Sequence, residues 1–175
     1  MKHFYLCAAL ALTSTAVAQP PSSVPEQVQA MKACGFLAGS WSGDGWVSSA
    51  PGQKASFHET EHIEPQLGGL LLLVRGQGTN ASGKSGHGAL AVLSFDAEDK
   101  KYHFRAYEQM GHYTDAPAQC SNNTMSWTLD AGPTKIHYTI SLTPKGQWHE
   151  VGMAEVQGAR PQQIFEMTLD KTPRS

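Results

Sequence analysis

Hydrophobic and polar residues alternate along most of the chain beyond residue 40, in short segments separated by turn residues. In the clearest segment, Ile136, Tyr138, Ile140 and Leu142 alternate with polar residues, which is the two-residue period of a strand with one buried face. Clusters rich in Gly, Pro, Asp and Asn mark the turns between such segments. The strands predicted in this way are 40–48, 54–64, 69–79, 86–95, 102–109, one short strand within 111–123, 124–129, 135–143, 147–156 and 162–171.

One segment has a helical period instead. Val24, Val28 and Met31 recur at spacings of four and three, and Gly35 is a natural stop, so a short amphipathic helix is predicted over 23–33. No second helix is predicted. We expect this helix to cover one end of the β-structure.

Short connections between successive strands favour neighbour-to-neighbour antiparallel pairing, and no βαβ pattern is present. The predicted fold class is therefore all-β: a closed antiparallel meander barrel of about ten strands with one short N-terminal helix. Residues 35–172 form the barrel, and 19–34 form a tether and the helix. Such a barrel can enclose a ligand, or its interior can be filled by side chains.

The first 18 residues have the features of a signal peptide. Lys2 precedes an apolar run over 4–12, and Ala16-Val17-Ala18 is a small-x-small cleavage pattern. The mature chain is then expected to begin at Gln19 and to be exported, to the periplasm or the extracellular space. It would carry a formal charge of −3, from twelve Lys and Arg against fifteen Asp and Glu. This charge gives no reason to expect nucleic acid as a partner, and no later segment is long enough for a membrane span.

Two cysteines, Cys34 and Cys120, remain after cleavage. In an exported protein they are candidates for a disulfide between the helical segment and the barrel wall. The alternative is two separate buried thiols, because sequence does not show whether the two Cα atoms lie within bridging distance.

Several short motifs carry a family likeness. The segment Leu37-Ala38-Gly39-Ser40-Trp41 after a short helix, with Gly68-Gly69, Trp148-x-Glu150 and 164–169, resembles a group of secreted bacterial lipocalin-like domains of the calycin superfamily. The resemblance implies that Trp41 closes one end of the barrel, and it implies a fold without a function.

A more distant similarity is to the haem-binding nitrobindin barrels, whose Gly-x-Trp-x-Gly-x-Gly opening is matched by 39–45. Those barrels also have a Tyr-Pro-Thr-Ile run and a ligating histidine near the C-terminus. Here 47–53 differs from that run, and the last histidine is His149. No cofactor is therefore expected, and haem is the less favoured alternative.

Polar residues in phase with apolar neighbours are candidates for the barrel interior. Phe57, Glu59, Glu61 and Ile63 share one face of their strand. If this face points inward, two carboxyl groups enter the interior; if it points outward, His58, Thr60 and His62 do so instead. The candidate ligand-binding residues are Trp41, Phe57, Glu59, Glu61, Tyr102, Phe104, Arg105, Tyr138, Trp148 and Glu150.

The favoured function is a secreted barrel that binds a small hydrophobic or amphipathic molecule, with the glutamates and Arg105 at its polar end. The alternatives are a packed scaffold or interaction domain, and a small enzyme that uses paired glutamates as acid and base; an enzyme is the less favoured class. No metal site is predicted, because no closely spaced Cys/His set exists. The segment 70–74 is apolar on both faces, so it packs under the helix or forms a homodimer contact.

Overall fold

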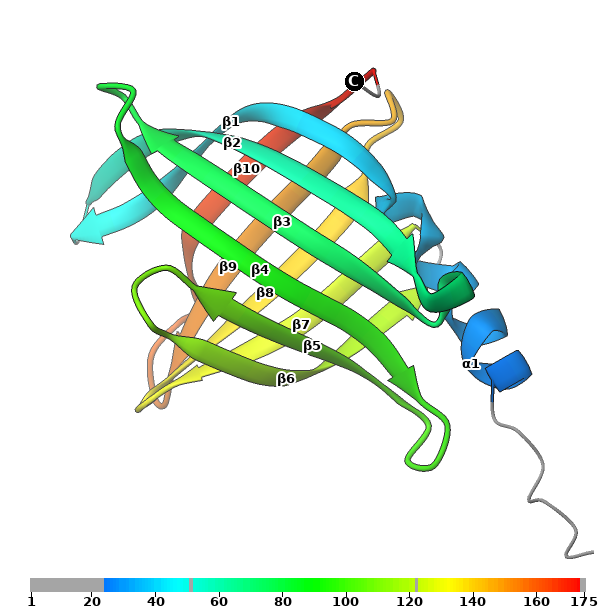
Figure 1. Cartoon of the computed structure of the whole chain (residues 1–175). Helices are drawn as coiled ribbons and strands as arrows, with labels where there is room; N and C mark the ends of the chain where they lie inside the picture. Colours follow the sequence, from blue (N-terminus) through cyan, green and yellow to red (C-terminus); the bar gives the residue numbers. More distant parts are fainter. Residues whose placement is uncertain (1–23, 51, 122, 174–175) are drawn as a thin grey trace, which may run out of the picture.

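Ten antiparallel strands close into a single barrel in the computed structural model, which describes residues 24–50, 52–121 and 123–173 (Figure 1). The strands are β1 Gly39–Ala50, β2 Gln53–Gln66, β3 Leu71–Asn80, β4 Ser85–Asp96, β5 Lys101–Glu108, β6 Tyr113–Ser121, β7 Thr124–Ala131, β8 Thr134–Leu142, β9 Trp148–Val156 and β10 Gln162–Thr172. This architecture confirms the predicted fold class. The irregular stretch 111–123 contains a nine-residue strand, β6.

The strands follow one another around the barrel as a meander. Each pairs with its successor, and β10 pairs with β1 to close the wall. On β1, Gly43 pairs with Glu59 of β2 on one side and with Leu169 of β10 on the other. Closure gives each strand a neighbour on both sides, but β6 and β7 pair only over Ala118–Ser121 and Thr124–Trp127, so their remaining residues do not pair with each other.

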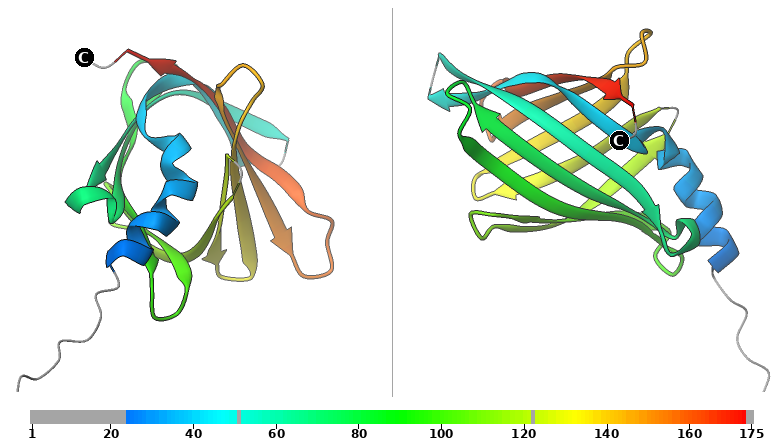
Figure 2. Two further views of the ribbon diagram at one scale, coloured as in Figure 1. Left: turned by 90° about the vertical axis from the view of Figure 1, so that its right-hand side faces the viewer. Right: turned by 45° about the horizontal axis from the view of Figure 1, so that its top comes forward.

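The chain enters the barrel through a helical segment that lies across one end of it (Figure 2). α1 spans Val24–Met31 and continues as the 3₁₀ helix η1, Lys32–Leu37. The predicted stop at Gly35 is therefore wrong: Gly35 lies within η1, and its carbonyl accepts a bond from the Ala38 N–H at 3.2 Å. The Tyr102 hydroxyl also donates to the Ala30 carbonyl at 2.8 Å and holds the helix on the barrel.

The helical segment defines two different barrel ends. We call the end crossed by α1 and η1 the covered end and the opposite end the far end. β1 leaves the covered end directly after η1, so the β2–β3 turn with the 3₁₀ helix η2, Leu67–Gly69, also lies there. α1 packs against β4 and η2, beside the apolar start of β3. No helix among the described residues is long and apolar enough to cross a bilayer.

Large side chains fill the interior at the covered end. Trp41 is 2% exposed, and its indole N–H donates to the Leu37 carbonyl at 2.9 Å. Its ring meets that of Trp148 edge-on, with centroids 5.9 Å apart. A disulfide joins Cys34 of η1 to Cys120 of β6, with the Cα atoms 5.4 Å apart. Trp41 and the disulfide together fix the helical segment to the barrel.

Candidate binding site inside the barrel

The structure settles which face of β2 points inward. Glu59 and Ile63 are 4% and 2% exposed, and Phe57 packs against Phe165 of β10. His58 points outward, where its ring bonds to Asp44 and Ser42 at 2.9 Å. Because successive side chains of a strand alternate between faces, Glu59 and Glu61 both belong to the inner face.

Three carboxyl groups meet inside the barrel: Glu59 and Glu61 of β2 and Glu150 of β9, called here the interior carboxyls. Glu150 is 7% exposed and accepts a bond from the Trp148 indole N–H at 3.2 Å. Two oxygen atoms, Glu59 Oε1 and Glu61 Oε2, are buried and have no hydrogen-bond partner within the described structure. Buried polar atoms are nearly always paired in proteins, so these two mark an incomplete site.

Glycines on β3 make room for two of the interior carboxyls. A Cβ atom at Gly76 would lie 2.7 Å from Glu61 Oε1, and one at Gly78 would lie 2.6 Å from Glu59 Oε2. These residues are also cross-strand partners, Glu61 with Gly76 and Glu59 with Gly78. The carboxyl groups therefore lie directly over the β3 backbone.

Burial raises the pKa of all three interior carboxyls. Desolvation brings the pKa of Glu59 to about 7, and the same cause brings that of Glu150 to about 7. The pKa of Glu61 rises well above its ordinary value, through desolvation and then through repulsion by Glu59 and Glu150. The effect of Glu59 and Glu150 on the pKa of Glu61 indicates that the three carboxyl groups interact electrostatically.

These raised pKa values predict that the protein loses stability as pH rises from about 4.5 to about 7. The folded state holds a proton on Glu59 that the unfolded state has already released, so the stabilisation is complete at low pH and is lost on the way to pH 7. One such group contributes on the order of 3 kcal/mol, from about 1.4 kcal/mol per pKa unit. Glu59→Gln should therefore be more stable than the wild type at pH 8 by a few kcal/mol, and nearly equal to it at pH 4.

Urea unfolding of both proteins across this pH range checks the prediction. The diagnostic quantity is the difference between variant and wild type, because the titration of every other group is common to both proteins. Glu64→Gln is the matched control, because Glu64 lies on the outer face of β2, where a hydrogen bond from Arg75 lowers its pKa. Equal stability of Glu59→Gln and wild type at pH 8 would contradict the burial argument.

Aromatic rings form a continuous chain next to the interior carboxyls, called here the aromatic arc. Neighbouring ring centroids lie 4.4 to 5.7 Å apart along it. Burial raises the pKa of Tyr138 to about 12, and the second cause is the charge of Glu150, which places the arc beside that carboxyl. The arc consists of Phe57, Phe165, Tyr138, Trp127 and Phe104.

The arc is less buried than the core at the covered end. Trp127, Tyr138 and Phe165 belong to the inner face by strand register, yet each is only partly buried. Leu93 and Leu169, on the same inner face, are 0% exposed. The interior is therefore closely packed at the covered end, and solvent reaches inward-facing side chains in the rest of the barrel.

A hollow of about 910 Å³ follows the wall formed by β1–β5. Most of the side chains that border it are on the outer face, among them Arg75, Leu90 and Tyr107. Glu61 and Gly76 border it as well, although both belong to the inner face. The hollow thus brings the outer surface of the wall close to one of the interior carboxyls.

The structure brings most of the sequence-predicted candidates together but separates two of them. Glu59, Glu61, Glu150, Phe57, Phe104, Tyr138 and Trp148 are all inner-face residues around the carboxyls or the arc, and Trp41 lies in the packed end. Tyr102 is bonded to α1 at the covered end. Arg105 lies on the outer face, where it bonds to Asp115 at 3.2 Å; since Phe104 points inward, its neighbour Arg105 does not.

Sequence reasoning missed some residues of the site. Trp127 and Phe165 complete the arc. Both could have been found from the two-residue period of their strands, because Trp127 shares a face with Met125 and Phe165 shares a face with Leu169. Gly76 and Gly78 could not be found in this way, because glycine has no side chain that would mark it as a buried or an exposed position. Their role depends on the carboxyls across the strand pair.

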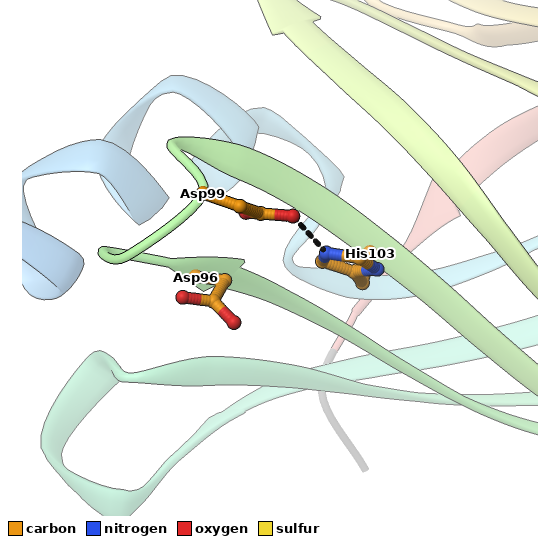
Figure 3. A group of neighbouring side chains, drawn as sticks. All are labelled: Asp96, Asp99 and His103. Atoms are coloured by element: carbon orange, nitrogen blue, oxygen red, sulfur yellow. Dashed lines mark hydrogen bonds and ion pairs between the residues drawn. The ribbon is translucent and has the colours of Figure 1, made fainter.

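A second cluster of polar groups lies at the β4–β5 turn, where donor atoms of Asp96, Asp99 and His103 lie within 4.8 Å of one another (Figure 3). Asp96 accepts the N–H of Glu98 at 2.7 Å, and this bond is the main cause of its lowered pKa. Asp99 accepts the N–H of Lys101 and the ring N–H of His103. These hydrogen bonds explain why the three side chains lie close together: they stabilise the exposed β4–β5 turn.

Comparison with known proteins supports the fold. No protein-family model and no curated protein sequence matches this chain. Among solved structures, the crystal structure of Rv2717c from M. tuberculosis is similar, with a TM-score of 0.58 and 14% identity over 82% of this chain and 98% of that chain. At this identity the likeness shows a shared barrel fold, and it assigns neither the lipocalin-like nor the nitrobindin family.

Proposed function

We propose that this protein is an exported barrel that binds a small, largely apolar molecule in its interior. The observation that carries the proposal is the pair of buried, unpartnered oxygen atoms, Glu59 Oε1 and Glu61 Oε2, beside partly buried aromatic rings. Ligand sites in proteins combine an apolar lining with a few placed polar groups, and the arc and the interior carboxyls have this composition. Similarity of fold alone would not support a function.

Export to an oxidising compartment is part of the proposal. The segment 1–18 that suggests it lies outside the described residues. The Cys34–Cys120 disulfide supports it, because such bonds persist in secreted and periplasmic proteins and are rare in the cytosol.

Binding in the interior is tested first by native mass spectrometry of protein purified without denaturation, followed by denaturing analysis. A reproducible non-covalent mass is expected. A neutral fluorescent probe, N-phenyl-1-naphthylamine, should also bind, and Ala89→Phe should weaken that binding severalfold because Ala89 faces inward between Gly76 and Glu108. The matched control is Leu90→Phe, which adds a larger side chain to the outer face of the same strand.

The possible outcomes separate the alternatives. A bare polypeptide mass without a probe response would overturn the proposal in favour of a packed scaffold. Loss of probe binding in Leu90→Phe with retention in Ala89→Phe would place the site in the outer hollow and contradict an interior site.

A small enzyme remains the second candidate function, favoured by one observation. Glu59 and Glu150 have a pKa of about 7, which suits a general acid or base at neutral pH. Turnover of a bound molecule, abolished in Glu59→Gln or Glu150→Gln, would support catalysis over simple binding.

A further inference from the structure

We propose that the interior site selects a molecule that carries an organic cation, such as a primary amine, with its charged group against Glu59, Glu61 and Glu150 and its apolar body against the aromatic arc. This inference rests on the proposed function, since it specifies the ligand class of the same site. It concerns the charge of the ligand, which neither the fold nor the comparisons indicate.

The first support is a contrast between the two faces of the wall. On the outer face, carboxylates have cationic partners: Glu64 bonds Arg75 at 2.7 Å, Asp115 bonds Arg105 at 3.2 Å and Asp130 bonds Lys135 at 2.7 Å. Within the described residues, the interior carboxyls have no ion pair. The most buried acidic groups of the described chain thus have no ion-paired cation, and the charge of His58 on the outer face acts on Glu59 only from the other side of the wall.

The residues around the interior carboxyls confirm the contrast. The cross-strand neighbours of Glu59 are Gly43 and Gly78, and those of Glu61 are Trp41 and Gly76. Glu150 has Ile140 and Met167 as its neighbours. The other titratable side chains with inner-face register are Tyr138, Glu108, His87 and Lys171. His87 is exposed, Lys171 lies over the Trp41 ring, and within the described residues neither forms an ion pair with an interior carboxyl.

The second support is the set of free acceptors. Glu59 is 4% exposed and has one buried oxygen without a partner, and Glu61 has another. A buried acceptor that lacks a hydrogen bond is costly. An ammonium group has three N–H donors and no acceptor, so it can supply a hydrogen bond to an oxygen that has none, on Glu59 or on Glu61.

The third support is the arc. Rings of Tyr, Trp and Phe attract cations through their faces, most strongly when water is excluded. Trp127 and Tyr138 stack with ring centroids 4.4 Å apart and an interplanar angle of 13°, and Tyr138 lies next to Glu150. A molecule with a ring and an amine separated by a short chain matches a site with these two parts.

An inorganic cation fits the interior less well. Metal sites need several oxygen ligands at close range. Within the described part of the chain, the group whose donor atoms converge within 4.8 Å is Asp96, Asp99 and His103 at the β4–β5 turn, and it does not include the interior carboxyls.

Three probes that share a phenyl ring and differ in charge test the inference: 2-phenylethylamine, 2-phenylethanol and 3-phenylpropanoate. Isothermal titration calorimetry at pH 8 should show the amine binding about tenfold or more tightly than the alcohol, because charge-assisted hydrogen bonds are the stronger ones, and the carboxylate binding least. Glu59→Gln and Glu150→Gln should each remove most of the preference for the amine. Glu64→Gln, which removes a carboxylate from the outer face of β2, should leave the preference unchanged.

The outcomes distinguish this inference from the function on which it rests. Equal binding of amine and alcohol would overturn the cation preference while leaving an apolar interior site intact. Tightest binding of the carboxylate would also overturn it. If none of the probes binds, and N-phenyl-1-naphthylamine does not bind either, the proposed function fails together with the inference. If Glu59→Gln does not fold, the three probes on the wild-type protein still decide the question.

Discussion

Replacing Cys34 and Cys120 together with alanine is expected to lower the free energy of unfolding by about 4 to 5 kcal/mol. The disulfide links residues 86 positions apart, and a cross-link of that span removes a large part of the conformational entropy of the unfolded chain. Equilibrium unfolding in urea, compared between the wild type and the double variant, measures the effect.

Reduction offers a control that changes no residue. The wild type treated with dithiothreitol should approach the stability of the double variant, and the double variant itself should not respond to the reductant. A difference below about 1 kcal/mol between oxidised wild type and double variant would show that the disulfide contributes little. The folded barrel would then hold its helical segment through packing and hydrogen bonds such as those of Tyr102 and Trp41.

Trp41→Ala is expected to cost about 3 to 5 kcal/mol, the range for removing a buried large aromatic side chain. Trp41 is 2% exposed, meets Trp148 edge-on and donates to the Leu37 carbonyl. The substitution opens a cavity at the covered end and also leaves a buried carbonyl without its donor. Thermal and urea unfolding measure the loss.

Two further variants separate the parts of this effect. Trp41→Phe keeps most of the packing and removes the N–H donor, so it should cost less than half as much as alanine. Trp46→Ala is the matched control on the outer face of the same strand, where the indole donates to Glu166 and lies under Lys54. An equal loss for Trp41→Ala and Trp46→Ala would contradict the role of Trp41 as the residue that closes the barrel.

The strand order of this fold could be predicted because its signals are local. The two-residue period of segments such as 135–143 survives in the structure as β8, and short turns join neighbouring strands. Even the weak segment 111–123 contains the strand expected in it, β6. The helix was predicted from its own period, whereas its continuation as η1 beyond Gly35 accompanies contacts with Cys120 and Trp41 that lie far away in sequence.

The candidate site could be predicted only in part. The two-residue period of a strand places Phe57, Glu59 and Glu61 on one face. Whether that face points into the barrel or out of it depends on how the strands close into a wall. The approach of Glu150 to Glu59 requires β10 and β1 to lie between β9 and β2, which no local pattern encodes. Naming both Phe104 and Arg105 as lining residues conflicted with the alternation of side chains along a strand, and the structure places Arg105 outside.

The cross-strand pairs Glu59–Gly78 and Glu61–Gly76 have a consequence for evolution. A Cβ atom at either glycine would lie within 2.7 Å of a carboxyl oxygen, so a side chain there would force the facing glutamate to move. Descendants of the same ancestor that keep Glu-x-Glu on one strand should therefore also keep Gly-x-Gly on the next. This linked pattern can be read from sequence alone, and it offers a way to recognise barrels with the same acidic interior when overall identity is too low to detect kinship.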